Sequence, residues 1–217
     1  LRSPLTNIQG YLEAVKDGVL EADESTVNTI YSQTTHLNSL VEDLRLLALV
    51  EAGNLRLELT NTDICELVSN ATEAFRPRAV DRSIGLEVTV SIGMPGTRLD
   101  PTRIRQVVSN LVENALTHTP DGGRVVVNVS PKTSHDVAAI ISVSDTGTGI
   151  SPEDLPQVFD RFYRVDPSRN RGTGGAGLGL TIVKRLVEAH GGQVEVTSVF
   201  GSETTFTVHI PFAGPTT

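Results

Sequence analysis

The chain has 217 residues, a formal net charge of -8 and one cysteine. This length allows one large domain, or a domain with a helical extension, to fold without disulfide bonds or a structural metal. One cysteine permits no internal disulfide, and five scattered histidines give no zinc-ligand spacing, so we expect a reducing compartment. The acidic charge disfavours binding to nucleic acid, because that requires a basic face that displaces counterions.

The ends and the longest apolar run of the chain suggest an excised piece of a larger protein. The longest aliphatic run, residues 46–50, is far below the ~20 residues that span a bilayer. The sequence begins at Leu1 without an initiator methionine, a basic segment or a signal-type apolar segment. We therefore expect a soluble fragment of a longer protein.

Residues 1–52 carry two apolar seams at helical spacing. The first ends near Gly18, and the second keeps a heptad spacing from Val27 to Ala48. This pattern predicts an antiparallel helical hairpin. Each buried leucine or isoleucine contributes ~1.5–3 kcal/mol, and a lone hairpin cannot bury both seams. We therefore expect a homodimer that forms a four-helix bundle. The alternative, that the seams pack on the rest of this chain, stays open.

A second domain is predicted over residues 53–212, followed by a tail at 213–217. The helical period stops at Gly53, and two later helices have clear starts: Asp63 with Glu66 forms a capping box, and Asp100 precedes Pro101. We expect an α+β chain in which helices of this domain cover one face of a mixed sheet. The expected strands are 55–59, 86–92, 125–129, 137–144, 193–199 and 205–210, and the expected helices start at Asp63, Asp100 and Leu178.

The helix that starts after Asp100 has a polar face beside its buried stripe. Asn110 and Asn114 lie one turn apart on this face, with Arg103 and Thr117 beside them. Amide oxygens are neutral ligands that suit Mg2+ held on phosphates. The alternative, two surface asparagines without a ligand, stays open because asparagine has no strong preference of its own in a helix.

The predicted strand that ends at Ser144 leads into an acidic, glycine-containing turn, with Asp145 followed by Gly147 and Gly149. A carboxylate at a strand end can accept a hydrogen bond from an exocyclic amine, and the glycines let the backbone lie close to a flat ring. A tight turn without a ligand fits the pattern equally well. The segment 151–153 that follows predicts a further capped helix start.

The run 172–180 is rich in glycine and precedes an amphipathic helix. Glycine amides can crowd a polyphosphate, and a helix N-terminus favours an anion. The spacing also matches the dinucleotide fingerprint, but residues 165–171 are polar and contain proline, whereas the fingerprint requires a strand there. Upstream, Phe159 and Phe162 are three residues apart and can be core anchors on one helix face. This interpretation is compatible with a functional one in which Arg161 and Arg164 reach phosphate.

In this order, the four segments resemble the ATP-binding signature of sensor histidine kinases. Residues 110–118 resemble the N box, 145–150 the first glycine box, 159–164 the F box and 174–180 the second glycine box. Residues 1–5 resemble the end of the H box of the dimerisation and phosphoacceptor hairpin. The resemblance implies a Bergerat-type α/β sandwich, the fold shared with gyrase and chaperone ATPases, that holds ATP under a lid of about residues 160–176.

The resemblance also implies the roles of individual residues. Asn114 coordinates Mg2+ through the ATP phosphates, Asn110 supports the phosphate end, and Asp145 binds the adenine amino group. Thr204 or Thr205 lines the adenine end, and Gly147 and Gly149 shape the pocket. The other implied contacts are glycines that cradle the phosphates (Gly175, Gly177, Gly179), arginines near the γ-phosphate (Arg161, Arg164, Arg171), and the pocket residues Phe159 and Leu178.

The implied activity is phosphoryl transfer from Mg-ATP to a histidine, and then to an aspartate of a response regulator receiver domain. The implied setting is the cytoplasmic portion of a membrane-anchored bacterial sensor at the inner membrane.

Three departures qualify this resemblance. The phosphoacceptor histidine falls upstream of Leu1, so we expect the chain to bind Mg-ATP without phosphorylating itself there. Ser3 stands where many relatives have threonine or asparagine, which leaves phosphatase activity open. Thr117 stands where relatives often have a basic residue, so one phosphate contact is missing or is supplied elsewhere. None of the five histidines occupies the phosphoacceptor position: His36, His118, His135, His190 and His209.

Two rival functions fit parts of the sequence. An ATP-hydrolysing clamp of the same fold needs a glutamate base where Asn110 stands, and an amide cannot take a proton from water at neutral pH. Glu113 lies ~100° around the helix from Asn114. The second rival is a non-catalytic dimeric interaction module with a degenerate site. The intact Asp145, both asparagines and the full glycine run disfavour it.

Overall fold

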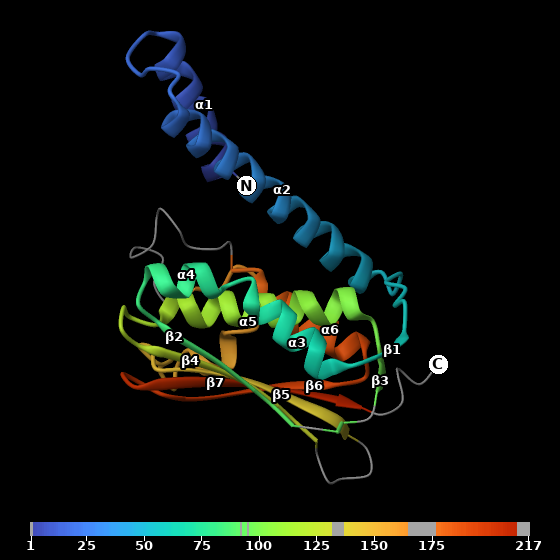
Figure 1. Cartoon of the computed structure of the whole chain (residues 1–217). Helices are drawn as coiled ribbons and strands as arrows, with labels where there is room; N and C mark the ends of the chain where they lie inside the picture. Colours follow the sequence, from blue (N-terminus) through green and yellow to red (C-terminus); the bar gives the residue numbers. More distant parts are fainter. Residues whose placement is uncertain (1, 92, 95, 132–136, 165–176, 212–217) are drawn as a thin grey trace. The chain divides into compact units, whose positions relative to one another are not determined.

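The computed structural model describes residues 2–91, 93–94, 96–131, 137–164 and 177–211. The chain divides into two compact units, Leu1–Gly53 and Asn54–Thr217, and each is described by itself (Figure 1). No helix of the described residues has both the length and the apolar character needed to cross a lipid bilayer.

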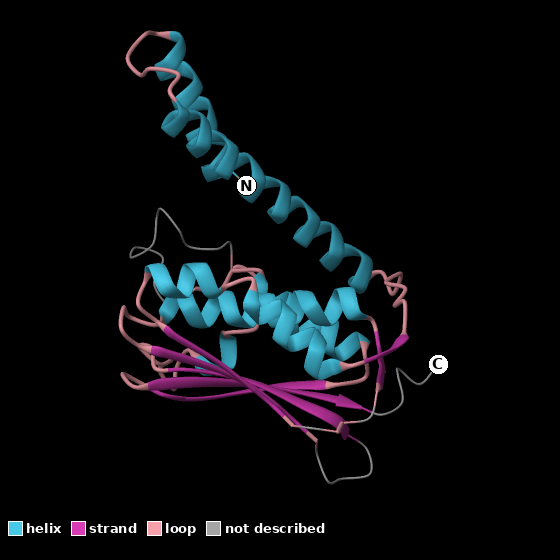
Figure 2. Cartoon of the chain, in the orientation of Figure 1, coloured by secondary structure: helices cyan, strands magenta, loops and turns pink. Residues whose placement is uncertain are grey.

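The first unit is a hairpin of two antiparallel helices, α1 (Arg2–Lys16) and α2 (Glu24–Glu51) (Figure 2). The turn between them contains Gly18 at φ 71°, a conformation that glycine adopts without strain. Asp23 caps α2 by accepting a hydrogen bond from the Thr26 amide at 2.7 Å. The predicted hairpin is therefore confirmed. Several apolar side chains remain exposed on it, namely Leu5, Leu12, Val19, Val27 and Val41.

The second unit is built on a five-stranded mixed sheet with the order β2-β4-β5-β7-β6. Strand β2 is parallel to β4, and the other neighbours are antiparallel. The strands of this sheet are β2 (Gly85–Val90), β4 (Arg124–Ser130), β5 (Val137–Asp145), β6 (Gln193–Val199) and β7 (Glu203–Pro211). A separate pair consists of β1 (Thr60–Thr62) and β3 (Thr97–Leu99).

Helices lie over one face of this sheet (Figure 1), so the predicted α/β sandwich is confirmed. The sheet contributes Val127, Ile141 and Val143 to the core, and the helices contribute Leu111 and Ile182; all are buried completely. Alternation along each strand directs every second side chain towards the helices. The helices are α3 (Ile64–Glu73), α4 (Arg76–Asp81), α5 (Pro101–His118) and α6 (Gly179–Ala189).

The predicted caps form and also connect the helices. Asp63 accepts hydrogen bonds from the amides of Cys65 and Glu66. Asp100 caps α5 through Oδ1, and its own amide donates to Nε2 of His190 at 3.2 Å, while Nδ1 of His190 lies 2.7 Å from the Leu186 carbonyl oxygen. Burial lowers the pKa of His190, so the ring is neutral at pH 7. These bonds fix the start of α5 against the end of α6.

Two local predictions were wrong. Residues 55–59 form no strand: their leucines alternate in burial as predicted, but pairing begins only at Thr60. No α-helix starts at Ser151, although its hydroxyl does cap a turn by accepting from the Asp154 amide at 3.2 Å. The chain continues as the short 3-10 helix η1 (Leu155–Gln157), where Pro156 has no amide hydrogen to extend a helix.

The two phenylalanines of the predicted F box do not share a helix face, which corrects a third expectation. Phe162 has φ 61° and is 61% exposed. Phe159 instead packs edge-on against Phe206 of β7, with ring centroids 6.1 Å apart. Of the two phenylalanines, Phe159 is therefore the one whose ring packs towards the core.

Candidate functional site

Asp145, the predicted base-binding carboxylate, lies at the end of β5 in the middle of the sheet. It pairs in register with Val125 of β4 on one side and Thr204 of β7 on the other. The residue is 4% exposed, and its Oδ1 accepts a hydrogen bond from the Gly147 amide at 2.9 Å. Burial raises the pKa of Asp145 to about 6, against the opposing effect of the Gly147 hydrogen bond. The carboxylate is therefore costly to keep without a partner and is suited to accept from a buried donor.

The two glycines after Asp145 have no room for a side chain. A Cβ at Gly147 would lie 2.5 Å from Oδ1 of Asp145 and 2.6 Å from the carbonyl oxygen of His118. Gly149 has φ 65°, and a Cβ there would lie 2.3 Å from the Val199 carbonyl oxygen. The turn is thus pressed between the end of α5 and the end of β6. Both positions therefore require glycine, because neighbouring protein atoms fill the space that a side chain would need.

Thr204 lies next to Asp145 and is buried, at 5% exposure. Its hydroxyl is 3.0 Å from that of Ser198, which also accepts from the Ile150 amide at 2.9 Å. Thr205 instead meets Ser144 through hydroxyls 2.8 Å apart, one register position away from Asp145. Of the two predicted threonines, Thr204 is therefore the register partner of the carboxylate.

The polar face of α5 is present as predicted, and it meets the start of α6. Asn110, Asn114 and Thr117 are all partly buried. Asn110 donates a hydrogen bond through Nδ2 to the carbonyl oxygen of Gly179 at 3.2 Å. A Cβ at Gly179 would lie 3.8 Å from Asn110 Cγ, an ordinary contact. The structure therefore brings the predicted N box against the described end of the second glycine box.

The F box is also tied to that glycine segment. The Phe162 amide donates to the Gly177 carbonyl oxygen at 3.0 Å, and the Thr181 hydroxyl donates to that of Phe159 at 2.9 Å. Gly177 has φ 72°, and a Cβ there would lie 2.8 Å from the Tyr163 carbonyl oxygen, so the position requires glycine. Leu178, the next residue, is buried. Residues 159–164 and 177–181 thus form one connected layer.

The predicted γ-phosphate arginines are only partly described. Arg161 is exposed and Arg164 is partly exposed. Arg171, Gly175 and most of the predicted lid lie outside the described residues.

Two residues that hold the site together were not predicted. Ser198 supports the first glycine box, as described above. Arg82 binds the end of α5 by donating to the carbonyl oxygens of Leu116 and Thr119 and to Oδ1 of Asp121. Both connect segments more than thirty residues apart, and no local pattern of the sequence signals such a pairing.

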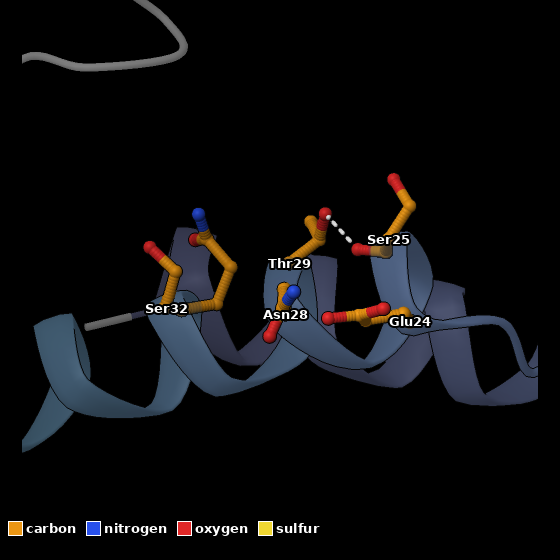
Figure 3. Close-up of a pocket in the computed structure, with 6 residues that line it drawn as sticks. Glu24, Ser25, Asn28, Thr29 and Ser32 are labelled. Atoms are coloured by element: carbon orange, nitrogen blue, oxygen red, sulfur yellow. Dashed lines mark hydrogen bonds between the residues drawn. The ribbon is translucent and has the colours of Figure 1, made fainter.

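An open polar hollow lies on the first turns of α2, in the other unit (Figure 3). The Thr29 hydroxyl donates to the Ser25 carbonyl oxygen at 2.9 Å there, an intrahelical bond. All the lining side chains come from a single helix surface, so the hollow offers no enclosed group for chemistry. They are Glu24, Ser25, Asn28, Thr29, Ser32 and Gln33.

The fold and two family models define the class of protein. Residues 99–214 match the family described as Histidine kinase-, DNA gyrase B-, and HSP90-like ATPase. Residues 1–53 match the family described as His Kinase A (phospho-acceptor) domain. Taken together, these matches and the relatives below show that the chain belongs to the sensor histidine kinases.

Individual relatives agree with this family. The chain is 37% identical over 215 residues to Sensor protein SrrB of Staphylococcus aureus (strain N315), and the match covers 97% of this chain and 36% of SrrB. The chain thus spans about a third of the length of the curated relatives it matches. Among solved structures, Acinetobacter baumannii histidine kinase AdeS is 30% identical with a TM-score of 0.81, covering 98% of this chain and 97% of AdeS. Full-length ShkA in complex with AMPPNP is 30% identical with a TM-score of 0.75, covering 98% of this chain and 44% of ShkA.

Proposed function

We propose that this chain binds Mg-ATP and supplies the phosphotransfer machinery of a two-component sensor. One observation carries the proposal: a buried carboxylate, Asp145, ends a central strand beside a turn that admits no side chain at Gly147. Among the solved relatives, the ShkA structure contains AMPPNP, an ATP analogue. The matched part of ShkA has a fold similar to that of this chain.

The adenine end selects the base by hydrogen bonding. The Asp145 carboxylate accepts from the exocyclic amine of adenine, and burial makes this bond strong because water competes poorly there. The backbone of Gly147 and Gly149 lies along the ring face. Guanine presents a carbonyl oxygen where adenine has its amine, so it would face the carboxylate without a donor.

The phosphate end positions charge. The Asn114 side-chain oxygen would hold Mg2+, which would neutralise and orient the phosphates. Asn110 keeps the start of α6 in place through its bond to Gly179, so the N-terminal amides of that helix face the anion. Arg161 and Arg164 supply positive charge from the F box.

The phosphate acceptor and the partners complete the proposal. His190 cannot accept a phosphoryl group, because both ring nitrogens lie at hydrogen-bonding distance from backbone atoms in the core. We expect the family's acceptor histidine to lie outside this sequence, so the chain alone binds ATP without stable phosphorylation. The phosphate would then pass to a response regulator aspartate. The exposed apolar side chains of α1 and α2 favour a homodimer, and the parent protein would be anchored in a bacterial inner membrane with this portion in the cytoplasm.

Calorimetric titration of the chain with ATP and GTP, each with and without Mg2+, tests the proposal. We expect ATP to bind at least about tenfold more tightly than GTP, because one bidentate or charge-assisted contact contributes about that much. ATP binding should strengthen when Mg2+ is added. Failure to bind ATP would overturn the proposal. Labelled phosphate that accumulates stably on a histidine of this chain would overturn the expectation that the chain alone is not phosphorylated.

A further inference from the structure

One arginine of helix α4 extends its side chain to the functional helix α5. Nη1 of Arg78 lies 3.1 Å from Oε1 of Glu113, and Nη2 lies 3.3 Å from the Thr117 hydroxyl oxygen. The Arg78 side chain is 40% exposed, and that of Glu113 is 58% exposed. The guanidinium is therefore accessible from solvent although it bridges two helices.

The Thr117 end of this bridge belongs to the polar face of α5. Asn110, Asn114 and Thr117 are spaced four and three residues apart, so their side chains share one face of the helix. Thr117 carries no charge, and its hydroxyl donates to the Glu113 carbonyl oxygen at 2.7 Å. Its oxygen can therefore accept from Arg78. Arg78 thus brings a positive charge from α4 to this end of the asparagine face.

A second arginine, Arg82, also links α4 to α5, and comparison with it shows which of the two arginines can change its partner. Arg82, one turn further along, donates to the carbonyl oxygens of Leu116 and Thr119, which end α5. Those acceptors are backbone groups at a helix end and need a donor in place. Arg82 also meets an exposed carboxylate, Asp121, but the hydrogen-bond partners of Arg78 on α5 are both side chains, Glu113 and Thr117, and exposed ion pairs are weak. Arg82 therefore fixes α4 against α5, whereas the Arg78 head group can exchange its partner.

We propose that Arg78 is a phosphate-binding residue of the nucleotide site. Its guanidinium leaves Glu113 and pairs with the polyphosphate when ATP lies along Asn110 and Asn114, and it provides the charge that Thr117 lacks. Glu113 holds the side chain ready when no nucleotide is bound. The inference rests on the proposed ATP binding. Arg78 lies outside residues 99–214, the part of the chain that matches the ATPase family.

Titrations of the Arg78→Gln chain with ATP and with adenosine test the proposal, because adenosine lacks the phosphates. We expect affinity for ATP to fall on the order of tenfold and affinity for adenosine to stay unchanged. Arg76→Gln is the matched control. It lies on the same helix, but its Nε pairs with Glu73 of α3 at 2.6 Å. It should change neither affinity.

Two further variants separate phosphate binding from a structural role. Thr117→Lys in the Arg78→Gln background should restore ATP affinity, since it places a cation on the same face. Glu113→Gln should raise ATP affinity and leave adenosine unchanged, because it releases Arg78. This variant carries the test if Arg78→Gln does not fold, and an unchanged or lower ATP affinity in it would then overturn the proposal.

The outcomes are distinguishable. If the unmodified chain binds ATP and Arg78→Gln binds it equally well, the role of Arg78 is wrong while the proposed function stands. If Arg78→Gln loses ATP and adenosine in equal proportion, Arg78 only ties the helices together, and the proposal is again wrong. If the unmodified chain binds no ATP, the proposed function itself fails, and the role of Arg78 fails with it.

Discussion

The two ends of the candidate site are built in different ways. At the adenine end, Asp145 is almost fully buried on a central strand. The backbone of His118 lies so close to Gly147 that this position has no room for a side chain. At the phosphate end, the described groups are partly exposed side chains of α5, with Arg78 held by an exposed carboxylate. The groups at the adenine end are held in one position by their neighbours, whereas the exposed charged side chains at the phosphate end can change partners.

This difference suggests that base and phosphate are recognised by separate means. A rigid buried acceptor discriminates between bases, because a wrong base leaves polar groups unpaired. An exposed cluster of polar and charged groups can follow phosphates that change position during transfer. Variants at the adenine end should therefore affect adenosine and ATP alike, and variants at the phosphate end should affect ATP alone.

The largest effect is expected for Asp145→Asn. An amide presents a donor as well as an acceptor to the adenine amine, so affinity for both adenosine and ATP should fall by about 100-fold. The measurement is calorimetric titration with each ligand. Loss of ATP affinity with adenosine affinity retained would contradict the division between the two ends.

The same variant should stabilise the free domain above pH 6. Because the folded-state pKa of Asp145 is raised to about 6, ionisation costs stability as pH rises from the unfolded pKa near 4 through 6. Removing the charge should recover on the order of 1–3 kcal/mol at pH 8. Asp154→Asn is the control with the opposite sign: hydrogen bonds from Tyr163 and Ser151 lower the pKa of Asp154, so its loss should not stabilise. Thermal unfolding at pH 4 and pH 8 measures both.

Gly147→Ala should weaken adenosine binding nearly as much as Asp145→Asn, because the added methyl group has no room. Its Cβ would lie 2.6 Å from the His118 carbonyl oxygen, and backbone cannot move aside easily. We expect a loss of about 1–3 kcal/mol in unfolding free energy and weaker binding of adenosine. Gly179→Ala is the matched control at the phosphate end, where the nearest atom would be 3.8 Å away. It should leave adenosine binding intact, and equal losses in both variants would contradict the comparison.

Adenosine affinity should depend on pH below about 6. The bound amine favours the ionised carboxylate, so protonation of the free site competes with binding. Affinity should be constant above pH 7 and fall about tenfold by pH 5. Adenosine is the better probe, because the phosphates of ATP titrate in the same range. A flat profile for Asp145→Asn is the expected control, and a pH dependence retained in that variant would assign the titration to another group.

A smaller effect confined to ATP is expected for Asn114→Ala. Removing one neutral ligand should weaken Mg-ATP about fivefold and leave adenosine unchanged, since Mg2+ keeps most of its ligands from water and phosphate. Titration of ATP at increasing Mg2+ concentration measures the loss. Asn128→Ala, on β4, serves as a control that removes an amide elsewhere in the same unit. A drop in adenosine affinity would place Asn114 at the base instead.

The sequence predicted the parts of this comparison that depend on neighbours in the chain. Helix caps at Asp63 and Asp100 and the turn after Asp145 are local, because each polar group finds its partner within three residues. Contacts between distant segments were not predictable. Arg78 and Thr117 are 39 residues apart, and Ser198 and Ile150 are 48 apart. No spacing pattern signals them, since the fold alone brings them together.

The wrong local predictions have the same origin. The leucines at 55, 57 and 59 are half-buried and alternate with exposed residues, yet a strand also requires a neighbouring strand. Among the described residues, a hydrogen bond of this segment runs from the Glu58 amide to the Asp100 side chain, which is no strand partner. Helix α4 has six residues, too few for a helical period to show in the sequence. Burial patterns are thus readable from the chain, whereas hydrogen-bond partners depend on the whole fold.

The smallest effect on binding is expected for Phe159→Leu, and it decides the role of this residue. Its ring meets Phe206 edge-on, and the Lys184 ammonium lies 5.7 Å from the ring centroid. Those contacts are internal, so the variant should lose about 1 kcal/mol of unfolding free energy and keep both ligand affinities within twofold. Thermal unfolding and adenosine titration of the same sample measure this. A selective fall in adenosine affinity at unchanged stability would instead make Phe159 a wall of the adenine pocket, as the family resemblance implies, and would extend the rigid end of the site to the F box.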